Sequence, residues 1–346
     1  MKRFILWLLL LMLGIWLGTR FEIANEREDQ PIRAFGWIDD PEAVKEHRTG
    51  RFCDTEAFAA PYSGPDDVFL WDACRTVTGD VLPPRDQRSV GSCVAFGTAS
   101  AIEHLLCVQI ANGTGEEYRD LAQEVIYGGS RVEIGGGTIR GDGSIGAWAA
   151  RFATEYGVIA RGQHGSHDLR AYDEARCREY GRRGVPDELE PLAKRHPVKS
   201  TSNVRSWDEC RAAIRNGYPI AVCSSQGFTM TRDADGFCRP SGTWMHCLAI
   251  VGIRGGARPG AFLLNSWGPN AHTGPRGPGD PSPAGFWADA KTVDRMLKQG
   301  DSWAFSAAVG FPPRKLNWYA SPARLRGLHL AANLHRPLEV LPCLQF

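Results

Sequence analysis

The stretch of sequence that decides the fold reads Gln87-Arg-Ser-Val-Gly-Ser-Cys93-Val-Ala-Phe96. From Cys93 to Ile110, apolar side chains recur three and four residues apart, which predicts a helix with one strongly apolar face. Cys93 would open this helix, where the positive end of the helix dipole and unpaired backbone N–H groups favour thiolate over thiol. We therefore expect Cys93 to be a reactive nucleophile whose pKa lies below that of a free thiol.

Two further patterns lie downstream, in a part of the chain that is rich in β-branched and aromatic residues. Residues 244–252 read Trp-Met-His-Cys-Leu-Ala-Ile-Val-Gly, so that His246 opens an apolar strand. Residues 263–268 read Leu-Leu-Asn-Ser-Trp-Gly and place Asn265 at the end of the next strand. A thiol, an imidazole and a group that orients the imidazole are the parts that nucleophilic catalysis by cysteine needs.

Taken together, these motifs resemble the papain-like cysteine peptidases over about residues 81–311. Gln87 precedes Cys93 by six residues, as in the family, and His246 and Asn265 are 19 residues apart, close to the family's spacing. The resemblance implies an α+β, papain-like two-lobed fold. A helical N-terminal lobe and a β-rich C-terminal lobe would enclose the active site in the cleft between them.

The resemblance also implies a role for each matched side chain. Cys93 would be the nucleophile, and His246 would be its base and later the acid for the leaving amine. Asn265 would orient the imidazole, while Gln87 would donate its amide to the developing oxyanion together with the Cys93 backbone N–H. Trp267, which we place with the substrate-binding residues, would shield the Asn–His hydrogen bond from water.

The segment before a predicted helix at 145–156 resembles the Gly-rich substrate wall of the family. Gly143 and Ser144 would pair with the substrate backbone as an added strand. The second residue before the scissile bond would enter a pocket whose walls map to Ile145, Gly146 and Cys247. Because these residues carry no charge, we expect an apolar residue to be preferred there.

Three departures from the family pattern leave the subfamily and the regulation open. Val94 stands where the family usually has Trp, and Val90 stands where it often has Cys. The usual long inhibitory pro-region is not recognisable in residues 21–80, which are short and broken by Pro.

Two other functions remain as alternatives to an endopeptidase. A cell-wall peptide amidase of a related Cys–His type shares the thiolate chemistry, but Gln87 and the motif at 265–268 argue against it. A catalytically inactive papain-fold protein with a binding or structural role is the other alternative, although none of the four matched catalytic residues is substituted.

Composition limits the partners and suggests a compartment. Lys+Arg 40 against Asp+Glu 39 gives a net charge of +1, which does not favour nucleic acid. We expect a peptide or protein substrate, no cofactor and no metal, because no Cys-x-x-Cys pair is present. Ten cysteines fit an oxidising compartment and disulfide bonds.

The chain divides into four predicted segments. Residues 1–20 begin with Lys2-Arg3 followed by 15 uncharged residues up to Gly18, which indicates a signal peptide or a signal anchor. Residues 21–80 would be an irregular N-terminal extension, 81–311 the peptidase domain and 312–346 a tail. The catalytic domain would then be secreted or membrane-anchored, outside the cytoplasm.

The pattern of apolar and turn residues predicts helices first and strands second. The remaining expected helices span 121–127 and 207–216, and the expected strands span 219–224, 245–253, 261–267 and 303–311. The Pro- and Gly-rich loop at 269–285 follows the asparagine motif, and we expect it to form a semi-rigid flap near the cleft.

Overall fold

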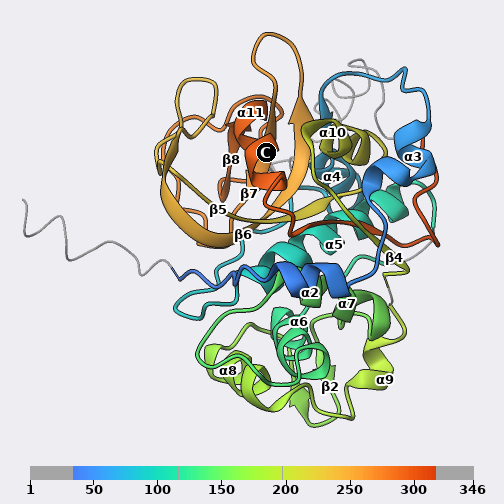
Figure 1. Ribbon diagram of the computed structural model, residues 1–346, viewed down its shortest axis with the longest axis vertical. Coiled ribbons are helices and arrows are strands. Elements are labelled where there is room, and N and C mark those ends of the chain that lie inside the picture. The colour runs from blue at the N-terminus through green and yellow to red at the C-terminus, as the bar shows by residue number, and fades with distance from the viewer. Residues whose placement is uncertain (1–33, 115–116, 197, 317–346) are drawn as a thin grey trace, which may run out of the picture.

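The computed structural model describes residues 34–114, 117–196 and 198–316. The signal segment and most of the predicted tail therefore lie outside the described residues. Within them the chain forms a helical lobe and a β-rich lobe, one below the other in Figure 1. The predicted α+β, two-lobed fold is confirmed.

Helix α5 (Cys93–Ala111) is the central element, and most of its residues are buried. By length and composition it could cross a membrane, but its burial makes it a core helix. The helical lobe is completed by α6 (Gln123–Gly129), a π-helical turn η2 (Ser130–Ile134), α7 (Gly146–Glu155), α8 (Glu174–Arg183), α9 (Glu190–Ala193) and the hairpin of β2 (Gln163–His164) and β3 (His167–Asp168).

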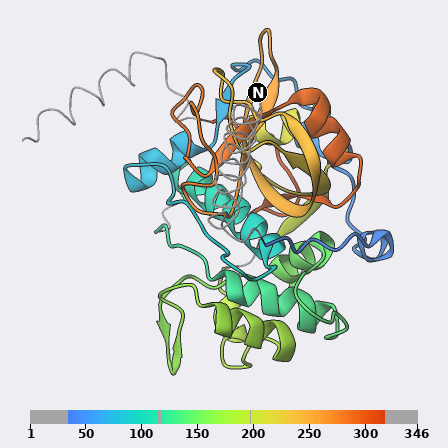
Figure 2. The same cartoon turned by 90° about the vertical axis from the view of Figure 1, so that its left-hand side faces the viewer.

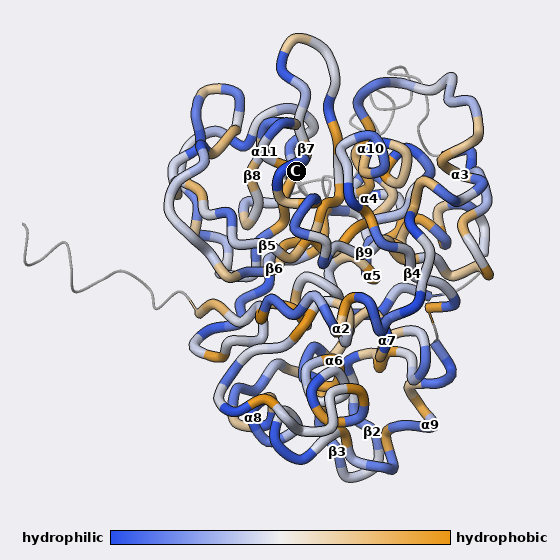
Figure 3. The backbone as a smooth tube through the Cα atoms, in the orientation of Figure 1, coloured by the Kyte–Doolittle hydropathy of each residue, from blue (hydrophilic) through white to orange (hydrophobic). Residues whose placement is uncertain are grey.

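The β-rich lobe is built on one antiparallel sheet with the strand order β4-β9-β5-β6-β7-β8. Its strands are β4 (Ser200–Asn203), β5 (Ile220–Phe228), β6 (Pro240–Arg254), β7 (Gly260–Leu264), β8 (Gly285–Asp289) and β9 (Ser302–Ser306), with α10 (Trp207–Arg215) and α11 (Ala290–Leu297) packed against them. The long strand β6 pairs with β5 on one side and β7 on the other, which places His246 opposite Ser224. Figure 3 shows apolar stretches along α5, whereas the β2–β3 hairpin is hydrophilic.

The N-terminal extension is more ordered than the irregular chain that the sequence suggested. It contains α2 (Pro41–Glu46), η1 (Phe52–Asp54), α3 (Glu56–Ala59), β1 (Val68–Phe69) and α4 (Trp71–Thr78). Strand β1 joins the sheet beside β6, and Trp71 stacks on Phe69 with 4.7 Å between the ring centroids. The pairing of β1 with β6, which is far away in the sequence, and the stacking of Trp71 on Phe69 order the short elements that Pro residues separate.

The other predicted helices and strands are confirmed with shifted ends, while α8, α9, α11, β4 and the hairpin of β2 and β3 were not predicted. The nine cysteines within the described ranges are all free thiols, and eight of them are buried. The predicted disulfide bonds therefore find no support there. Buried cysteine packs as a small apolar side chain, which accounts for this use of the residue.

Candidate active site

Cys93 is the first residue of α5, and Ser92 precedes it as the N-cap residue. Tyr172 fixes the segment that leads into α5. Its hydroxyl donates to the Gln87 carbonyl at 3.2 Å and lies 3.3 Å from Ser92 Oγ. The ring of Tyr172 also packs edge-on against Phe96 at 5.0 Å. The stretch from Gln87 to Phe96 is thus fastened to the helical lobe.

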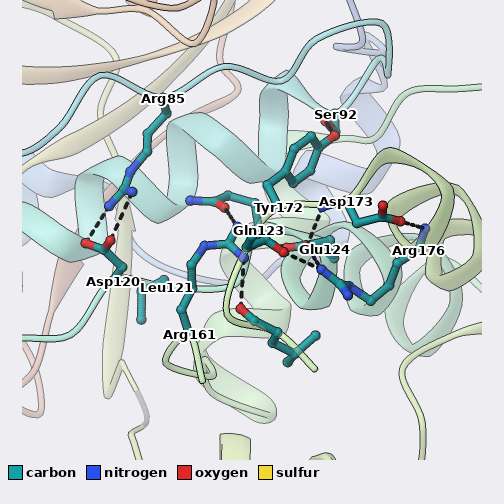
Figure 4. Close-up of polar contacts among 12 residues, drawn as sticks. Arg85, Ser92, Asp120, Leu121, Gln123, Glu124, Arg161, Tyr172, Asp173 and Arg176 are labelled. Atoms are coloured by element: carbon teal, nitrogen blue, oxygen red, sulfur yellow. Dashed lines mark hydrogen bonds and ion pairs between the residues drawn. The ribbon is translucent and has the colours of Figure 1, made fainter. Parts of the chain in front are cut away.

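A buried carboxylate anchors Tyr172 in turn. Figure 4 shows Arg161 and Arg176 converging on Glu124, at 3.2 and 2.9 Å. The backbone N–H of Asp173, next to Tyr172, donates to the same carboxylate at 3.1 Å. Because the charge of Glu124 is fully buried, losing a partner would be costly, and the loop that carries Tyr172 is held firmly.

The Gln87 side chain has a fixed orientation. Its Oε1 accepts from Ser266 Oγ at 2.6 Å, and its Nε2 donates to the Val90 carbonyl at 3.0 Å. Nε2 also donates to the carbonyl of Ala34 at 3.1 Å. The amide nitrogen is therefore aimed at a site that holds a peptide carbonyl oxygen.

His246 on β6 meets Asn265, which directly follows the neighbouring strand β7, as their motifs implied. His246 Nε2 lies 2.9 Å from Asn265 Oδ1, and both side chains are buried. The indole of Trp267 covers the imidazole, with 4.5 Å between ring centroids and 31° between planes. Nδ1 of His246 is buried and has no hydrogen-bond partner within the described part of the chain.

An extended segment of the chain itself, residues 34–38, lies between the two lobes. The N–H groups of Gly36 and Trp37 donate to the Met245 carbonyl at 3.1 and 3.0 Å. On the other side, Ser144 N donates to the Gly36 carbonyl at 2.8 Å, and Ile38 N donates to the Ser144 carbonyl at 2.9 Å. Figures 1 and 2 both show this part of the chain leading across the molecule to α2.

Only glycine fits at the centre of this segment. A Cβ atom on Gly36 would lie 1.9 Å from the Gly91 carbonyl oxygen, which is a severe overlap with backbone. Gly91 precedes Ser92 and Cys93, so the segment passes directly over the start of α5. Residues 34–38 thus lie against the start of α5.

Comparisons with known proteins match this architecture with solved structures. Xylellain, a cysteine protease from Xylella fastidiosa, has a TM-score of 0.56 at 18% identity over 81% of this chain and 98% of its own. A procathepsin B, S9, from Trypanosoma congolense has a TM-score of 0.51 at 15% identity over 79% and 86%. The ragweed pollen allergen Amb a 11, a cysteine protease in its proform, has a TM-score of 0.50 at 14% identity over 84% of both chains.

The chain has the papain-like fold. No family model and no curated protein match the sequence itself. Identities of 14–18% show a shared fold alone, and the chemistry depends on this chain's own side chains.

The predicted thiolate is not present in this arrangement of the papain-like fold. Burial raises the pKa of the Cys93 thiol, and the backbone N–H groups of Cys247, Gly36 and Val94 lower it only in part. Burial also lowers the pKa of His246 to about 4, which the hydrogen bond to Asn265 only partly opposes. Burial thus favours the neutral form of both groups in this arrangement.

In the predicted substrate wall, the backbones of Gly143 and Ser144 have different hydrogen-bond partners. Ser144 pairs with the extended segment, as expected of a strand-binding residue. Gly143 does not, because its N–H donates to the Tyr127 hydroxyl at 3.0 Å and its carbonyl accepts from Arg131. Cys247 is turned toward α5, since its Sγ lies 2.7 Å from where a Gly97 Cβ would be.

A buried carboxylate that the sequence did not reveal lies next to this wall. Asp301 Oδ2 accepts from the Gly146 N–H at 2.7 Å and from the indole N–H of Trp37 at 2.8 Å. Its Oδ1 accepts from the indole of Trp303 at 2.6 Å. Asp301 therefore lies beside Gly146, one of the residues expected to form uncharged pocket walls, and the expected apolar preference stays a prediction.

The loop at 269–285 is fastened rather than free. The Gly279 carbonyl accepts from Trp71 and Arg75 of α4 at 2.9 and 3.0 Å. Arg232 donates to the carbonyls of Gly274 and Gly285 at 3.0 and 2.9 Å. These contacts, which come from distant parts of the sequence, argue against the expected flap.

Proposed function

We propose that the protein is a thiol-dependent peptidase in which Cys93 attacks the carbonyl carbon of a peptide bond. The observation that carries this proposal is the extended peptide already lying at the site. Residues 34–38 use backbone hydrogen bonds to Met245 and Ser144, and the Ala34 carbonyl accepts from Gln87. Such contacts fit a peptide backbone better than a sugar or a nucleotide.

The proposed reaction proceeds through a thioester. Nδ1 of His246 takes the thiol proton as Cys93 Sγ bonds to the carbonyl carbon, and Gln87 Nε2 with the Cys93 N–H stabilises the oxyanion. The C–N bond then breaks, and His246 gives its proton to the leaving amine. Water, activated by the same imidazole, hydrolyses the thioester and regenerates the thiol. Asn265 keeps Nε2 of His246 engaged throughout.

The segment at 34–38 supports a latent form of this enzyme. In a substrate, residues before the reacting carbonyl would pair with Ser144. Here the carbonyl on Gln87 belongs to Ala34, and the residues paired with Ser144 follow it in the chain. The segment therefore runs opposite to the direction expected of a substrate, and it covers the site without being placed for cleavage. The T. congolense and ragweed structures are likewise of proforms.

The test uses a variant designed to displace the segment. Gly36→Ala adds a Cβ that overlaps the Gly91 carbonyl, so residues 34–38 should leave the site. Gly50→Ala is the matched control, because a Cβ atom there would lie 3.9 Å from Asp54 Oδ2, which is ordinary van der Waals contact. Hydrolysis of casein and of fluorogenic peptides is measured for wild type, both variants and Gly36→Ala combined with Cys93→Ala.

We expect Gly36→Ala to hydrolyse peptides faster than wild type and Gly50→Ala, and the double variant to be inactive. Activity that survives Cys93→Ala would refute the assignment of the nucleophile. Cleavage of purified cell wall without cleavage of casein would favour the amidase. A Gly36→Ala protein that is folded, unreactive toward a peptidyl epoxide and inactive would favour the non-catalytic alternative.

The location outside the cytoplasm also remains a proposal. It rests on the basic and apolar sequence of residues 1–18 and on the cysteine content. The membrane is a proposed partner on the same basis.

A further inference from the structure

Asn265 has a hydrogen-bonding partner on each end of its side-chain amide. Oδ1 accepts from the backbone N–H of Ser266 at 2.8 Å and lies 2.9 Å from His246 Nε2. A backbone N–H can only donate, so this contact identifies the oxygen end of the amide. His246 must then carry its proton on Nε2, which leaves the lone pair on Nδ1.

The nitrogen end of the same amide meets a second histidine. Asn265 Nδ2 lies 3.1 Å from Nε2 of His272, a buried residue in the loop after β7. The His272 ring packs on Phe286 at 4.6 Å, and its Nδ1 lies 3.8 Å from Cys238 Sγ. Because Nδ2 is a donor, Nε2 of His272 has to be the acceptor and its proton sits on Nδ1.

We infer that His272 is a positioning residue: by accepting from Asn265 Nδ2 it fixes the amide and, through it, the protonated nitrogen of His246. This inference deepens the proposed peptidase site and rests on it. His272 touches neither substrate nor the reacting atoms. It lies in the loop that the sequence marked only as a Pro- and Gly-rich insertion.

The physical reason is that an amide can rotate by half a turn at little steric cost. With an apolar side chain at position 272, the buried Nδ2 would lose its acceptor, and a buried unpaired donor is unfavourable. The rotated amide would present N–H groups to His246 Nε2 and to Ser266 N–H. Either outcome weakens the hydrogen bond that keeps the Nδ1 lone pair of His246 available to Cys93.

The experiment is a double-mutant cycle in the Gly36→Ala protein, with kcat and KM measured for a fluorogenic peptide. His272→Leu removes the acceptor and keeps bulk, whereas His272→Gln can place Oε1 where Nε2 lies. We expect His272→Leu to lower kcat about 3- to 10-fold with KM unchanged, and His272→Gln to stay within about two-fold of the parent. In Asn265→Ala, adding His272→Leu should have no further effect.

Ser282→Ala is the matched control, because Ser282 is a buried residue of the same loop whose hydroxyl accepts from the Ala284 N–H instead of contacting the Asn265 amide. Additive losses in the cycle, equal losses for Leu and Gln, or an unchanged kcat in His272→Leu would overturn the inference. If the parent has no peptidase activity, the ¹⁵N shifts of the His246 ring decide. A single Nε2–H form that becomes a mixture in His272→Leu supports the inference, and no change refutes it.

Discussion

On the β-rich lobe, the imidazole of His246 is hydrogen-bonded by Asn265 and covered by Trp267, which both follow β7. At the start of α5, the sulfur of Cys93 is instead covered by Gly36, which belongs to a five-residue segment near the N-terminus. The hydrogen bond that orients the base thus comes from its own lobe, whereas the segment contacts both catalytic residues, since Phe35 packs edge-on against the His246 imidazole with 6.1 Å between ring centroids. The difference teaches that departure of the segment would keep the Asn265–His246 hydrogen bond and remove contacts from both Cys93 and His246.

The largest effects are expected when the side chain of Cys93 or of His246, the two residues compared above, is removed. In the Gly36→Ala background, Cys93→Ala or His246→Ala should lower kcat/KM by about 10⁴-fold or more, because both take part in bond making. Asn265→Ala should lower it less, by about 10- to 100-fold, since it only orients the base. Steady-state hydrolysis of one peptide substrate compares the three. Full activity in Asn265→Ala would remove it from the site.

Displacing the segment should increase the reactivity of Cys93 and keep the hydrogen bond between Asn265 and His246. Overpacking at Gly36 costs about 1–3 kcal/mol, so we expect labelling of Cys93 by iodoacetamide at pH 7 to rise about 10- to 100-fold in Gly36→Ala. Burial raises the pKa of Cys93 in the covered form, and wild type should therefore react well only at alkaline pH. Peptide mapping identifies the labelled cysteine. Equal labelling of Cys107 or Cys247 would contradict the proposed reactivity.

Once the segment at 34–38 has left, Asp301 should determine which substrate side chain is preferred in the space that Trp37 occupied. Departure of Trp37 removes one of the donors to this buried carboxyl, so a substrate side chain with an N–H group, Trp or Arg, should be preferred over Leu. Asp301→Asn in the Gly36→Ala background should reduce that preference about ten-fold. A peptide library measures it. A profile that favours Leu in both proteins would restore the apolar preference expected from the sequence.

The smallest expected effect concerns acid stability. Burial lowers the pKa of His104 to about 4, from an ordinary value of 6.5. The unfolded chain therefore binds more protons between these values, and stability falls as the pH drops from 6.5 toward 4. His104→Asn can still donate to the Ser100 carbonyl and should reduce this slope by up to about 1.4 kcal/mol per pH unit. Urea unfolding across this range tests it, with the exposed His196→Asn as control.

The sequence by itself determined the main elements and the residues that the proposal uses. The 3.6-residue period after Cys93 marked α5, and the spacings of Gln87, His246 and Asn265 marked the site, because local periodicity and motif order are properties of neighbouring residues. The same local patterns could not show that Glu124 holds the loop carrying Tyr172.

Only the tertiary structure decided what covers and orients the site. Residues 34–38 and Asp301 carry no motif, and each matters through contacts with residues far away in the sequence, such as Met245 or Gly146. His272 is only seven residues from Asn265, but no local pattern shows that the loop turns its ring back onto the amide. The predicted thiolate was wrong for the same reason. A helix N-terminus alone lowers the pKa of a cysteine, but burial raises the pKa of Cys93, and in this chain burial is the larger effect.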